Sequence, residues 1–434
     1  MVDTVRRGDG AAGATARDGA EHIDLASWEP DYTGDPYPFY AQLREQAPVT
    51  RVVLEGLSLW LVTRYDDIRE GLSDPRLSND TKLADEVTRA VPWVGAQAAG
   101  TRHVLRADPP DHTRLRRLVA KAFTPRRIEA LRPRIQQITD ELVAAIRPRG
   151  HADILADFAL PLPLTVICEL FGVSAAKHTE FVRWVNIFFG VDEGDAGRNT
   201  EAREWIAGYL AQQLHREETG RGGQPADAEQ GTLLDGLIAA RDAGDKLSSE
   251  ELLSMTFLLL IAGYETTVNL IGNGLATLLR SPDQLAAVRA DPRLIRPAIE
   301  EFLRFESPIK TTPFLRITTT AVTIGGVAIP ARQPVLFAFG SANRDPAHFS
   351  EPDRFDVRRA DRGHLGFGHG IHYCLGAPLA RLEAEIAFTT LLANCPDLAL
   401  AADPAALEWR RSRVLRALKR LPVTFTATAA TSRP

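Results

Sequence analysis

The longest regular pattern of hydrophobic and polar positions runs from Ser248 to Leu279 and predicts a single helix. It opens with Ser248-Ser249-Glu250-Glu251, which is typical of a capping box. At about 1.5 Å per residue this helix would span about 48 Å, enough to cross a whole domain. Ser281-Pro282 predicts its end. We therefore expect this helix to be the centre of the fold.

The other patterns predict a mainly α protein with smaller β-sheets. Amphipathic helices are expected at 39–45, 65–72, 126–150, 160–172, 294–306 and 377–393, and a basic helix is expected after residue 111. Strands are expected at 49–53, 57–62, 314–318, 322–324, 327–329 and 335–339, and 408–425 alternates like strands. Residues 80–104 and 217–231 read as irregular. No repeat or interior linker divides the pattern, so we expect one large domain at 23–425 with tails at 1–22 and 426–434.

Composition narrows the class of protein. The chain has 434 residues, 44% hydrophobic and 25% charged, as ordinary soluble proteins do, and its net charge of -5 argues against general nucleic-acid binding. Three cysteines are too few for a disulfide framework and fit a reducing cytoplasm. Residues 1–22 lack the apolar core of a signal peptide, and no segment offers the ~20 apolar residues of a membrane span. We expect a cytoplasmic protein without a membrane anchor.

One glycine-rich segment carries the most specific chemistry. Phe367-Gly368-His369-Gly370-Ile371-His372-Tyr373-Cys374-Leu375-Gly376 places a lone cysteine just before a predicted helix. Glycines let the backbone take positive φ and approach a flat partner, and free amides at a helix start favour a thiolate. Such a thiolate can be an axial ligand of haem iron. The plainer alternative is a free cysteine buried as a small hydrophobic residue.

The spacing Phe-Gly-x-Gly-x-His-x-Cys-x-Gly resembles the haem-ligand loop of the cytochrome P-450 family, the haem-thiolate monooxygenases. The resemblance covers about residues 25–425 and implies haem b as cofactor. It implies that Cys374 ligates the iron, that His372 hydrogen-bonds a propionate and that Phe367 shields the sulfur. Gly368 and Ala262 would also contact the cofactor. A thiolate ligand favours cleavage of the O–O bond.

The middle of the long helix contains residues with low helix propensity, in the run Ala262-Gly263-Tyr264-Glu265-Thr266-Thr267. Threonine hydroxyls can bond preceding carbonyls, so we expect the helix to open locally here. The resemblance implies that Glu265 and Thr266 are an acid–alcohol pair, which delivers protons while dioxygen is activated. The alternative is a helix kink packed in a core.

Two charged sets follow from the same resemblance. Glu301-x-x-Arg304 is a weak signal alone, but with Pro352-Asp353-Arg354-Phe355 it matches a structural clamp of Glu301, Arg304 and Arg354. His112, Arg116 and Arg316, with His372, would bind the haem propionates. The basic helix could equally be a solvated face, and Arg114, Arg117 and Lys121 on its outer side would suit an acidic ferredoxin.

The substrate pocket is assigned by family position and is mostly apolar, which suits a bulky, weakly polar molecule. Its expected residues are Trp93, Val94, Val104, Phe188, Val191, Leu258, Leu259, Ala262, Ile309, Thr312, Phe314, Val414 and Leu415, any of which could instead be core. We expect Lys310 to reach outward, or else to pair with a polar substrate group. Members of the family usually carry glycine in the turn position where Arg332 stands, so the resemblance predicts a local stability cost there.

These features predict a haem-thiolate monooxygenase that inserts one oxygen atom of O2 into a C–H bond. The resemblance points to macrolides and other polyketides, or steroid- or terpene-like molecules, as substrates. No GxGxxG fingerprint for a flavin or nicotinamide is present, so electrons would come from a ferredoxin and its NAD(P)H-dependent reductase. We expect a monomer. Epoxidation, oxidative coupling, peroxide use, a non-enzymatic haem sensor and a helical binding module without cofactor are the alternatives.

Overall fold

The largest sheet has six strands in the order β1-β2-β3-β9-β6-β4. The computed structural model describes residues 23–24, 34–54, 56–88, 103–173, 175–189, 198–220, 233 and 247–428. The strands are β1 (Ile23–Asp24), β2 (Val49–Leu54), β3 (Leu57–Val62), β9 (Pro334–Phe337), β6 (Arg316–Thr318) and β4 (Leu77–Ser78). β2 and β3 form an antiparallel hairpin, whereas β3 pairs with β9 in parallel.

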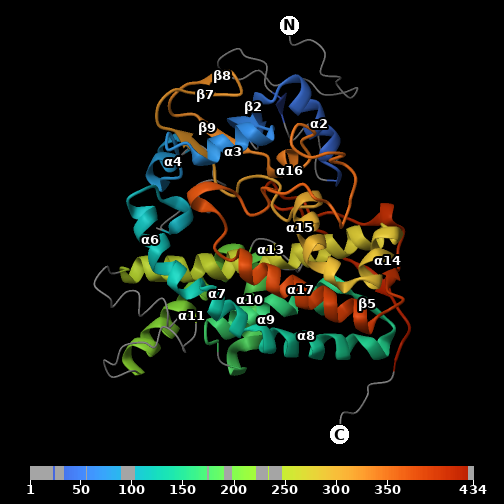
Figure 1. Ribbon diagram of the computed structural model, residues 1–434. Coiled ribbons are helices and arrows are strands. Elements are labelled where there is room, and N and C mark those ends of the chain that lie inside the picture. The colour runs from blue at the N-terminus through green and yellow to red at the C-terminus, as the bar shows by residue number, and fades with distance from the viewer. Residues whose placement is uncertain are drawn as a thin grey trace. The chain divides into compact units, whose positions relative to one another are not determined.

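Alternating side chains cover this sheet on both faces. Leu57, Leu59 and Leu61 of β3 pack with Phe39 and Leu43 of helix α2 (Tyr37–Gln46). The opposite face packs against helix α3 (Tyr65–Ser73), which lies close to the strands in Figure 1. Because side chains on a strand point alternately to its two faces, the alternating run 57–62 fills both clusters.

Tertiary contacts divide the chain into two compact units whose segments interleave along the sequence. The sheet unit consists of Met1–Ala99, Asn269–Cys374 and Pro396–Phe425, and the helical unit consists of Gly100–Val268, Leu375–Cys395 and Thr426–Pro434. Neither unit is a continuous piece of chain.

The sheet unit also contains short helices and two small antiparallel pairs of strands. Its helices are α4 (Thr81–Thr88), α14 (Pro282–Ala290), α15 (Ile295–Phe305) and α16 (Phe339–Ala342). The strand pairs are β7 (Val322–Ile324) with β8 (Val327–Ile329), and β10 (Ala399–Leu400) with β11 (Pro422–Thr424). Arg332, between β8 and β9, has φ 59°, which confirms that this turn requires the left-handed conformation.

The helical unit contains most of the long helices. They are α6 (Asp111–Ala120), α7 (Pro125–Ala130), α8 (Arg132–Ile146), α9 (Pro161–Leu170), α10 (Ala175–Phe189), α11 (Asn199–Gly220) and α17 (Ala377–Asn394), with the short strand β5 (His151–Asp153). α8 and α17 run side by side in Figure 1. A hydrogen bond joins them, in which Gln136 Nε2 donates to Thr390 Oγ1 at 2.9 Å.

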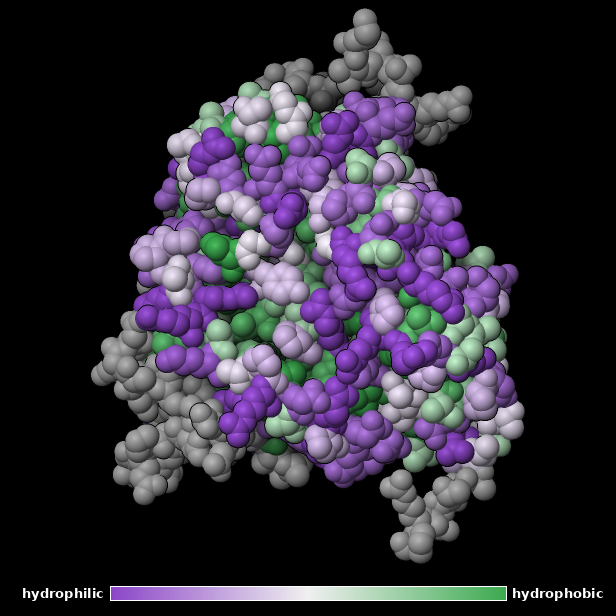
Figure 2. All heavy atoms as spheres, in the orientation of Figure 1, coloured by the Kyte–Doolittle hydropathy of each residue, from purple (hydrophilic) through white to green (hydrophobic). Residues whose placement is uncertain are grey.

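Helix α13 (Ser249–Leu279) is the longest, with 31 residues, and belongs to both units. The predicted capping box is confirmed, because Glu251 N donates to Ser248 Oγ at 3.1 Å and Ser248 N donates to Glu251 Oε2 at 2.9 Å. By length and composition this helix could cross a membrane, but 61% of its most apolar window is buried inside the protein, as in a core helix. On the face shown in Figure 2, hydrophilic residues predominate and hydrophobic ones surface in small groups.

Three sequence expectations are corrected or bounded by the structure. Part of the irregular stretch 80–104 is helix α4, whose start is capped by Asp80: its carboxylate accepts from the backbone N–H of Lys82 at 2.7 Å. The first part of the loop expected at 217–231 is helical instead, since α11 continues to Gly220, and 221–232 lies outside the described residues. In 408–425 only β11 is a strand, with isolated bridges at Trp409–Leu418 and Ile309–Leu415.

Glu383 of α17 generates a test of the core of the helical unit. Its side chain is 2% exposed, and burial raises the pKa of its carboxyl to about 8. Between its unfolded pKa and this value the unfolded chain ionises while the folded one keeps its proton, so stability falls as pH rises. We expect Glu383→Gln to raise the free energy of unfolding at about pH 8 by roughly 1–4 kcal/mol and to have little effect at about pH 5.

Thermal unfolding of the protein, followed by circular dichroism across this pH range, measures the effect. Glu385→Gln, on the same helix but only half-buried, is the matched control. A wild-type pH dependence in Glu383→Gln would show that Glu383 is not held protonated.

Candidate functional site

Cys374 closes a loop whose backbone is held by its own hydrogen bonds. Its N–H donates to the carbonyl of Phe367 at 2.9 Å, and the N–H of Gly368 donates to the carbonyl of Leu365 at 2.8 Å. Gly368 and Gly370 have φ of 72° and 70°, as the glycine pattern predicted. The cysteine side chain is half-buried, so the thiol is not sealed in a core.

Close backbone contacts explain why two positions of this segment are occupied by glycine. A Cβ on Gly370 would lie 3.0 Å from the carbonyl oxygen of Leu72, and one on Gly366 would lie 2.9 Å from that of Leu303. The loop therefore packs directly on the end of α3 and on α15. A side chain at either position would push the loop away from these helices.

The sheet unit places two of the predicted propionate-binding residues. Arg316 of β6 is 6% exposed and donates to the carbonyl of Leu77 at 3.4 Å. His372 Nε2 lies 3.1 Å from the side-chain nitrogen of Asn79, which is 7% exposed. An amide nitrogen can only donate, so Nε2 accepts and the proton of a neutral His372 ring sits on Nδ1.

The helical unit carries the other two, on helix α6. His112 and Arg116 are four residues apart and share one side of the helix; His112 is buried and Arg116 half-buried. The expectation that Arg114 faces outward is wrong, because its guanidinium forms an ion pair with the buried carboxylate of Glu251 in α13. Arg117 and Lys121 are exposed, as predicted.

Helix α13 is less buried between Phe257 and Thr266 than along the rest of its length. Ala262 is exposed, and Leu258, Leu259, Glu265 and Thr266 are half-buried, whereas Leu260 is fully buried. Thr266 Oγ1 donates to the carbonyl of Ala262 at 2.6 Å, which confirms the predicted back-bonding. The expected local opening is not present, since the helix continues without interruption from Ser249 to Leu279. A threonine hydroxyl can donate a hydrogen bond to a carbonyl of the preceding turn without breaking the backbone hydrogen bonds of the helix.

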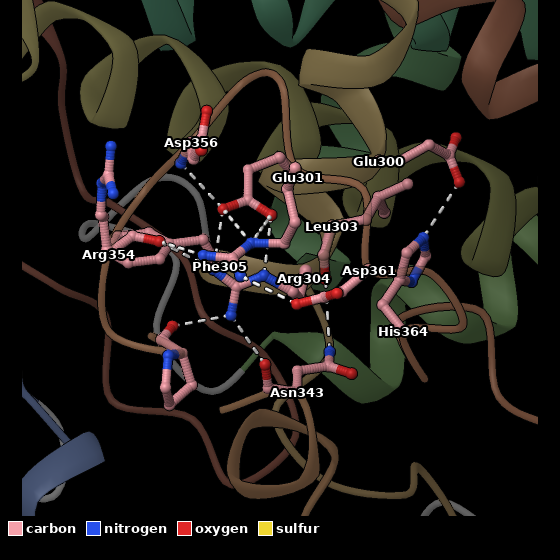
Figure 3. A network of polar contacts seen from close by, with 12 residues as sticks. Glu300, Glu301, Leu303, Arg304, Phe305, Asn343, Arg354, Asp356, Asp361 and His364 are labelled. Atoms are coloured by element: carbon pink, nitrogen blue, oxygen red, sulfur yellow. Dashed lines mark hydrogen bonds and ion pairs between the residues drawn. The ribbon is translucent and has the colours of Figure 1, made fainter. Parts of the chain in front are cut away.

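The predicted clamp is present but its third member is different. Arg304 and Glu301 form a bidentate pair, with both bonds 2.7 Å long, and are 2% and 3% exposed. Figure 3 shows this pair at the centre of the network. Arg359 Nε donates to both carboxylate oxygens of Glu301, at 3.2 and 3.1 Å.

Arg354 was expected to supply the third charge, and this is wrong. Its guanidinium is 58% exposed and pairs with Glu351 at 3.0 Å, while its backbone carbonyl accepts from Arg304 at 3.2 Å. The chain direction at residue 354 turns the side chain to solvent and the carbonyl inward. Arg359, five residues later, has its side chain 7% exposed and takes the buried position.

Two segments of the expected pocket are joined in the sheet unit. Ile309 and Leu415 form a β-bridge, and Lys310 N donates to the carbonyl of Val414 at 2.8 Å. Thr312 N donates to the carbonyl of Phe337 at 2.9 Å, and Thr312 is 5% exposed. Phe314 is half-buried. In the helical unit Val104 is 4% exposed. Trp93, Val94 and Val191 lie outside the described residues, as does the side chain of Phe188 at the end of α10.

Lys310 does not reach outward, contrary to the first expectation. Its side chain is 3% exposed, and burial together with Arg416 lowers the pKa of its amine to about 7. Its Cβ would lie 3.6 Å from a Cβ placed on Gly340, so the side chain begins toward α16. Pairing with a substrate group is left as the open alternative.

Comparisons with known proteins agree with this geometry. A family model described as Cytochrome P450 matches residues 30–397. The 6-deoxyerythronolide B hydroxylase of Saccharopolyspora erythraea is 45% identical over 396 residues, which cover 90% of this chain and 96% of that protein. The vitamin D(3) 25-hydroxylase of Pseudonocardia autotrophica is 45% identical over 413 residues, covering 94% and 97%. The structure of the tirandamycin C-bound P450 monooxygenase TamI has a TM-score of 0.82 at 43% identity, covering 93% and 100%.

The fold and the cysteine loop define a haem-thiolate enzyme, and the chain belongs to the cytochrome P450 family. Haem b is its cofactor and monooxygenation its reaction class. The residues fit this group, because a half-buried thiol ends a loop whose glycines allow close approach, and a buried arginine and a histidine lie in the same unit. Like its relatives, the enzyme needs a redox partner and a small-molecule substrate.

Three residues in the network around the site were missed by sequence reasoning. Arg359 belongs to no motif, whereas Arg354 stands in the Pro352-Asp353-Arg354-Phe355 motif and was therefore predicted instead. Asn79, which contacts His372, and His364, which contacts Glu300 at 3.1 Å, come from segments without a recognised pattern. The signal for His364 in the sequence is its position three residues before Phe367, at the start of the glycine-rich segment.

The different roles of Arg359 and Arg354 can be tested directly. Arg359→Ala removes one partner of the buried Glu301 carboxylate, so we expect unfolding to become easier by roughly 3–5 kcal/mol. Arg354→Ala removes an exposed ion pair and is expected to cost at most about 1 kcal/mol. Denaturant unfolding of both variants measures the difference. Equal losses would contradict the assignment of Arg359 to the clamp.

Proposed function

We propose that this monooxygenase hydroxylates a bulky, largely apolar molecule of the macrolide or polyketide class, with steroid- or terpene-like molecules as the next candidates. The observation that carries the proposal is the segment of α13 between Phe257 and Thr266, where Leu258, Leu259 and Ala262 are not fully buried. Apolar side chains left open beside a hydroxyl suit a large ligand with few polar groups. The named relatives act on 6-deoxyerythronolide B and vitamin D(3), and a solved neighbour binds tirandamycin C.

The residues around the cofactor have separate proposed roles. When bound, the haem supplies dioxygen activation and the transfer of one oxygen atom to the substrate. Cys374 would hold it as a thiolate, and Phe367 would cover the sulfur. His112, Arg116, Arg316 and His372 would bind the two propionates, because buried carboxylates require cations or hydrogen-bond donors. Gly368 and Ala262 would let the flat group approach the backbone and the helix.

Thr266 and Glu265 are proposed to deliver protons. Thr266 Oγ1 now gives its proton to the carbonyl of Ala262. A rotation of its hydroxyl would turn that proton toward the uncovered side of α13, and the half-buried Glu265 is the acid next to it. Glu301, Arg304 and Arg359 have a structural role only.

Electron supply is proposed to come from a ferredoxin reduced by an NAD(P)H-dependent reductase, and the enzyme is proposed to be a cytoplasmic monomer. Arg117 and Lys121 are exposed on or just after α6, which supports docking of an acidic partner. This patch is smaller than the sequence predicted, because Arg114 is paired with Glu251.

A ligand screen tests the substrate class. The oxidised, haem-loaded protein is titrated with macrolides, linear polyketides, sterols and terpenes while the low- to high-spin change of the haem spectrum is recorded. We expect saturable shifts with members of the polyketide group. Cys374→Ser is the control for the ligand assignment, and it should lose the thiolate-type spectrum of the reduced carbon monoxide complex. Shifts confined to small polar molecules would contradict the proposal.

Thr266→Ala tests proton delivery. With the hydroxyl gone, we expect product formed per electron consumed to fall by roughly tenfold or more, while substrate-induced spectral shifts persist. Coupling is measured from NADPH consumed, product formed and peroxide released. Thr267→Ala is the matched control, because Thr267 Oγ1 makes the same kind of bond, to Gly263 at 3.1 Å, but its side chain is buried. Similar coupling in wild type and Thr266→Ala would remove this role.

A further inference from the structure

His364 lies between helix α15 and the loop that ends at Cys374. Its Nε2 is 3.1 Å from Glu300 Oε2, and its Nδ1 accepts from the backbone N–H of Gly366 at 3.1 Å. Figure 3 shows the Glu300 carboxylate and the His364 ring facing each other at the edge of the clamp network. The His364 side chain is 9% exposed and that of Glu300 is 30% exposed. A histidine this well enclosed, with both nitrogens in use, has a fixed orientation.

The two contacts also determine where the ring carries its proton. Gly366 N–H can only donate, so Nδ1 accepts and carries no hydrogen. The proton then sits on Nε2 and is donated to the Glu300 carboxylate. Glu300 therefore selects the ring form that can hold Gly366. Carboxylate–histidine pairs of this kind orient the groups that surround a metal ligand.

The position of Gly366 is passed to the cysteine through its neighbours Leu365 and Phe367. Gly366 packs against the Leu303 carbonyl, and Leu365 N donates to Asn343 Oδ1 at 2.6 Å. The His364 ring lies 5.9 Å from the ring of Phe367, centroid to centroid. The carbonyl of Phe367 in turn accepts from Cys374 N. A continuous set of contacts thus connects Glu300 with the backbone of Cys374.

This set of contacts differs from the Glu301–Arg304 clamp, although Glu300 and Glu301 are neighbours on α15 and Asn343 takes part in both sets. The clamp holds the carbonyls of Asn343, Pro352 and Arg354. These lie ahead of the cysteine loop, whereas His364 contacts Gly366 and Phe367 at its beginning.

We propose that His364, oriented by Glu300, is a positioning residue for the haem-ligand loop and sets the place of Phe367 and of the Cys374 sulfur. The proposal rests on the proposed role of Cys374 as the axial ligand. If the loop shifts, sulfur donates less negative charge to the iron, which favours the reduced iron and raises the reduction potential. Protonated thiol also replaces thiolate more readily.

The test uses the haem-loaded protein and three measurements: the thiolate-ligated fraction of the reduced carbon monoxide complex, the haem reduction potential and the Tm. We expect His364→Ala to lower the thiolate-ligated fraction by roughly twofold or more and to raise the potential. His364→Asn is the conservative variant, since its Oδ1 can replace Nδ1 as the acceptor for Gly366. It should recover most of the wild-type fraction, and Glu300→Ala should lie between the two.

Arg354→Ala is the matched control, because it removes an exposed ion pair of the same region, and its partner Glu351 lies outside the loop. We expect it to leave the fraction and the potential unchanged. A wild-type fraction and potential in His364→Ala, or in Glu300→Ala if His364→Ala does not fold, would overturn the proposal. If Cys374→Ser keeps a thiolate-type spectrum, the ligand assignment fails instead, and the two failures are thereby distinguished.

Discussion

The buried charge of Glu301 is the constraint on which the approach to Cys374 depends. A carboxylate that is 3% exposed is stable only if cations and donors surround it. Arg304, Arg359 and the N–H of Asp356 fill that requirement, and the remaining donors of Arg304 bond backbone carbonyls from distant segments. Each charge therefore orders a piece of chain with no regular secondary structure. The path from α15 to the cysteine loop is held by these bonds.

A second buried cluster uses the same principle in the sheet unit. Burial would raise the pKa of the Glu306 carboxyl, but Arg416 and Arg344 together lower it, so the carboxylate stays charged. Arg416 Nε donates to Glu306 Oε1 at 2.7 Å, and Tyr37 O–H donates to the same oxygen at 2.7 Å. Burial raises the pKa of Tyr37, which keeps its hydroxyl protonated as a donor. This cluster joins α2, the end of α15 and the segment after Val414, and so supports one wall of the expected pocket.

The chemistry and the support are carried by different parts of the molecule. Apolar residues and Thr266 of α13 are not fully buried, while charged residues such as Glu301 and Arg304 are buried where they hold segments without helices or strands. His364 adds a hydrogen-bonded support at the start of the cysteine loop, where Gly366 N–H donates to its Nδ1. A haem-thiolate enzyme needs this division, because the sulfur must be placed accurately by a loop, whereas the residues that meet the substrate must stay accessible.

The sequence by itself determined the features that depend on neighbouring residues. The period of apolar positions predicted α13, the Ser-Ser-Glu-Glu sequence predicted its capping box, and the alternation at 57–62 predicted β3. Glycine spacing predicted the backbone of the Cys374 loop for the same reason, because φ preferences and helix capping are local.

Only the tertiary structure decided which long side chains meet. Arg354 carried the motif, yet the chain turns its guanidinium to solvent, and Arg359 reaches Glu301 instead. Lys310 is buried, Arg114 is paired with Glu251, and His364 joins Glu300 to Gly366 across 64 positions of sequence. Which side chains form an ion pair or a hydrogen bond depends on the path of the backbone and on which charges are buried together. Neither is visible in the order of residues, because contacts between distant segments exist only after the chain has folded.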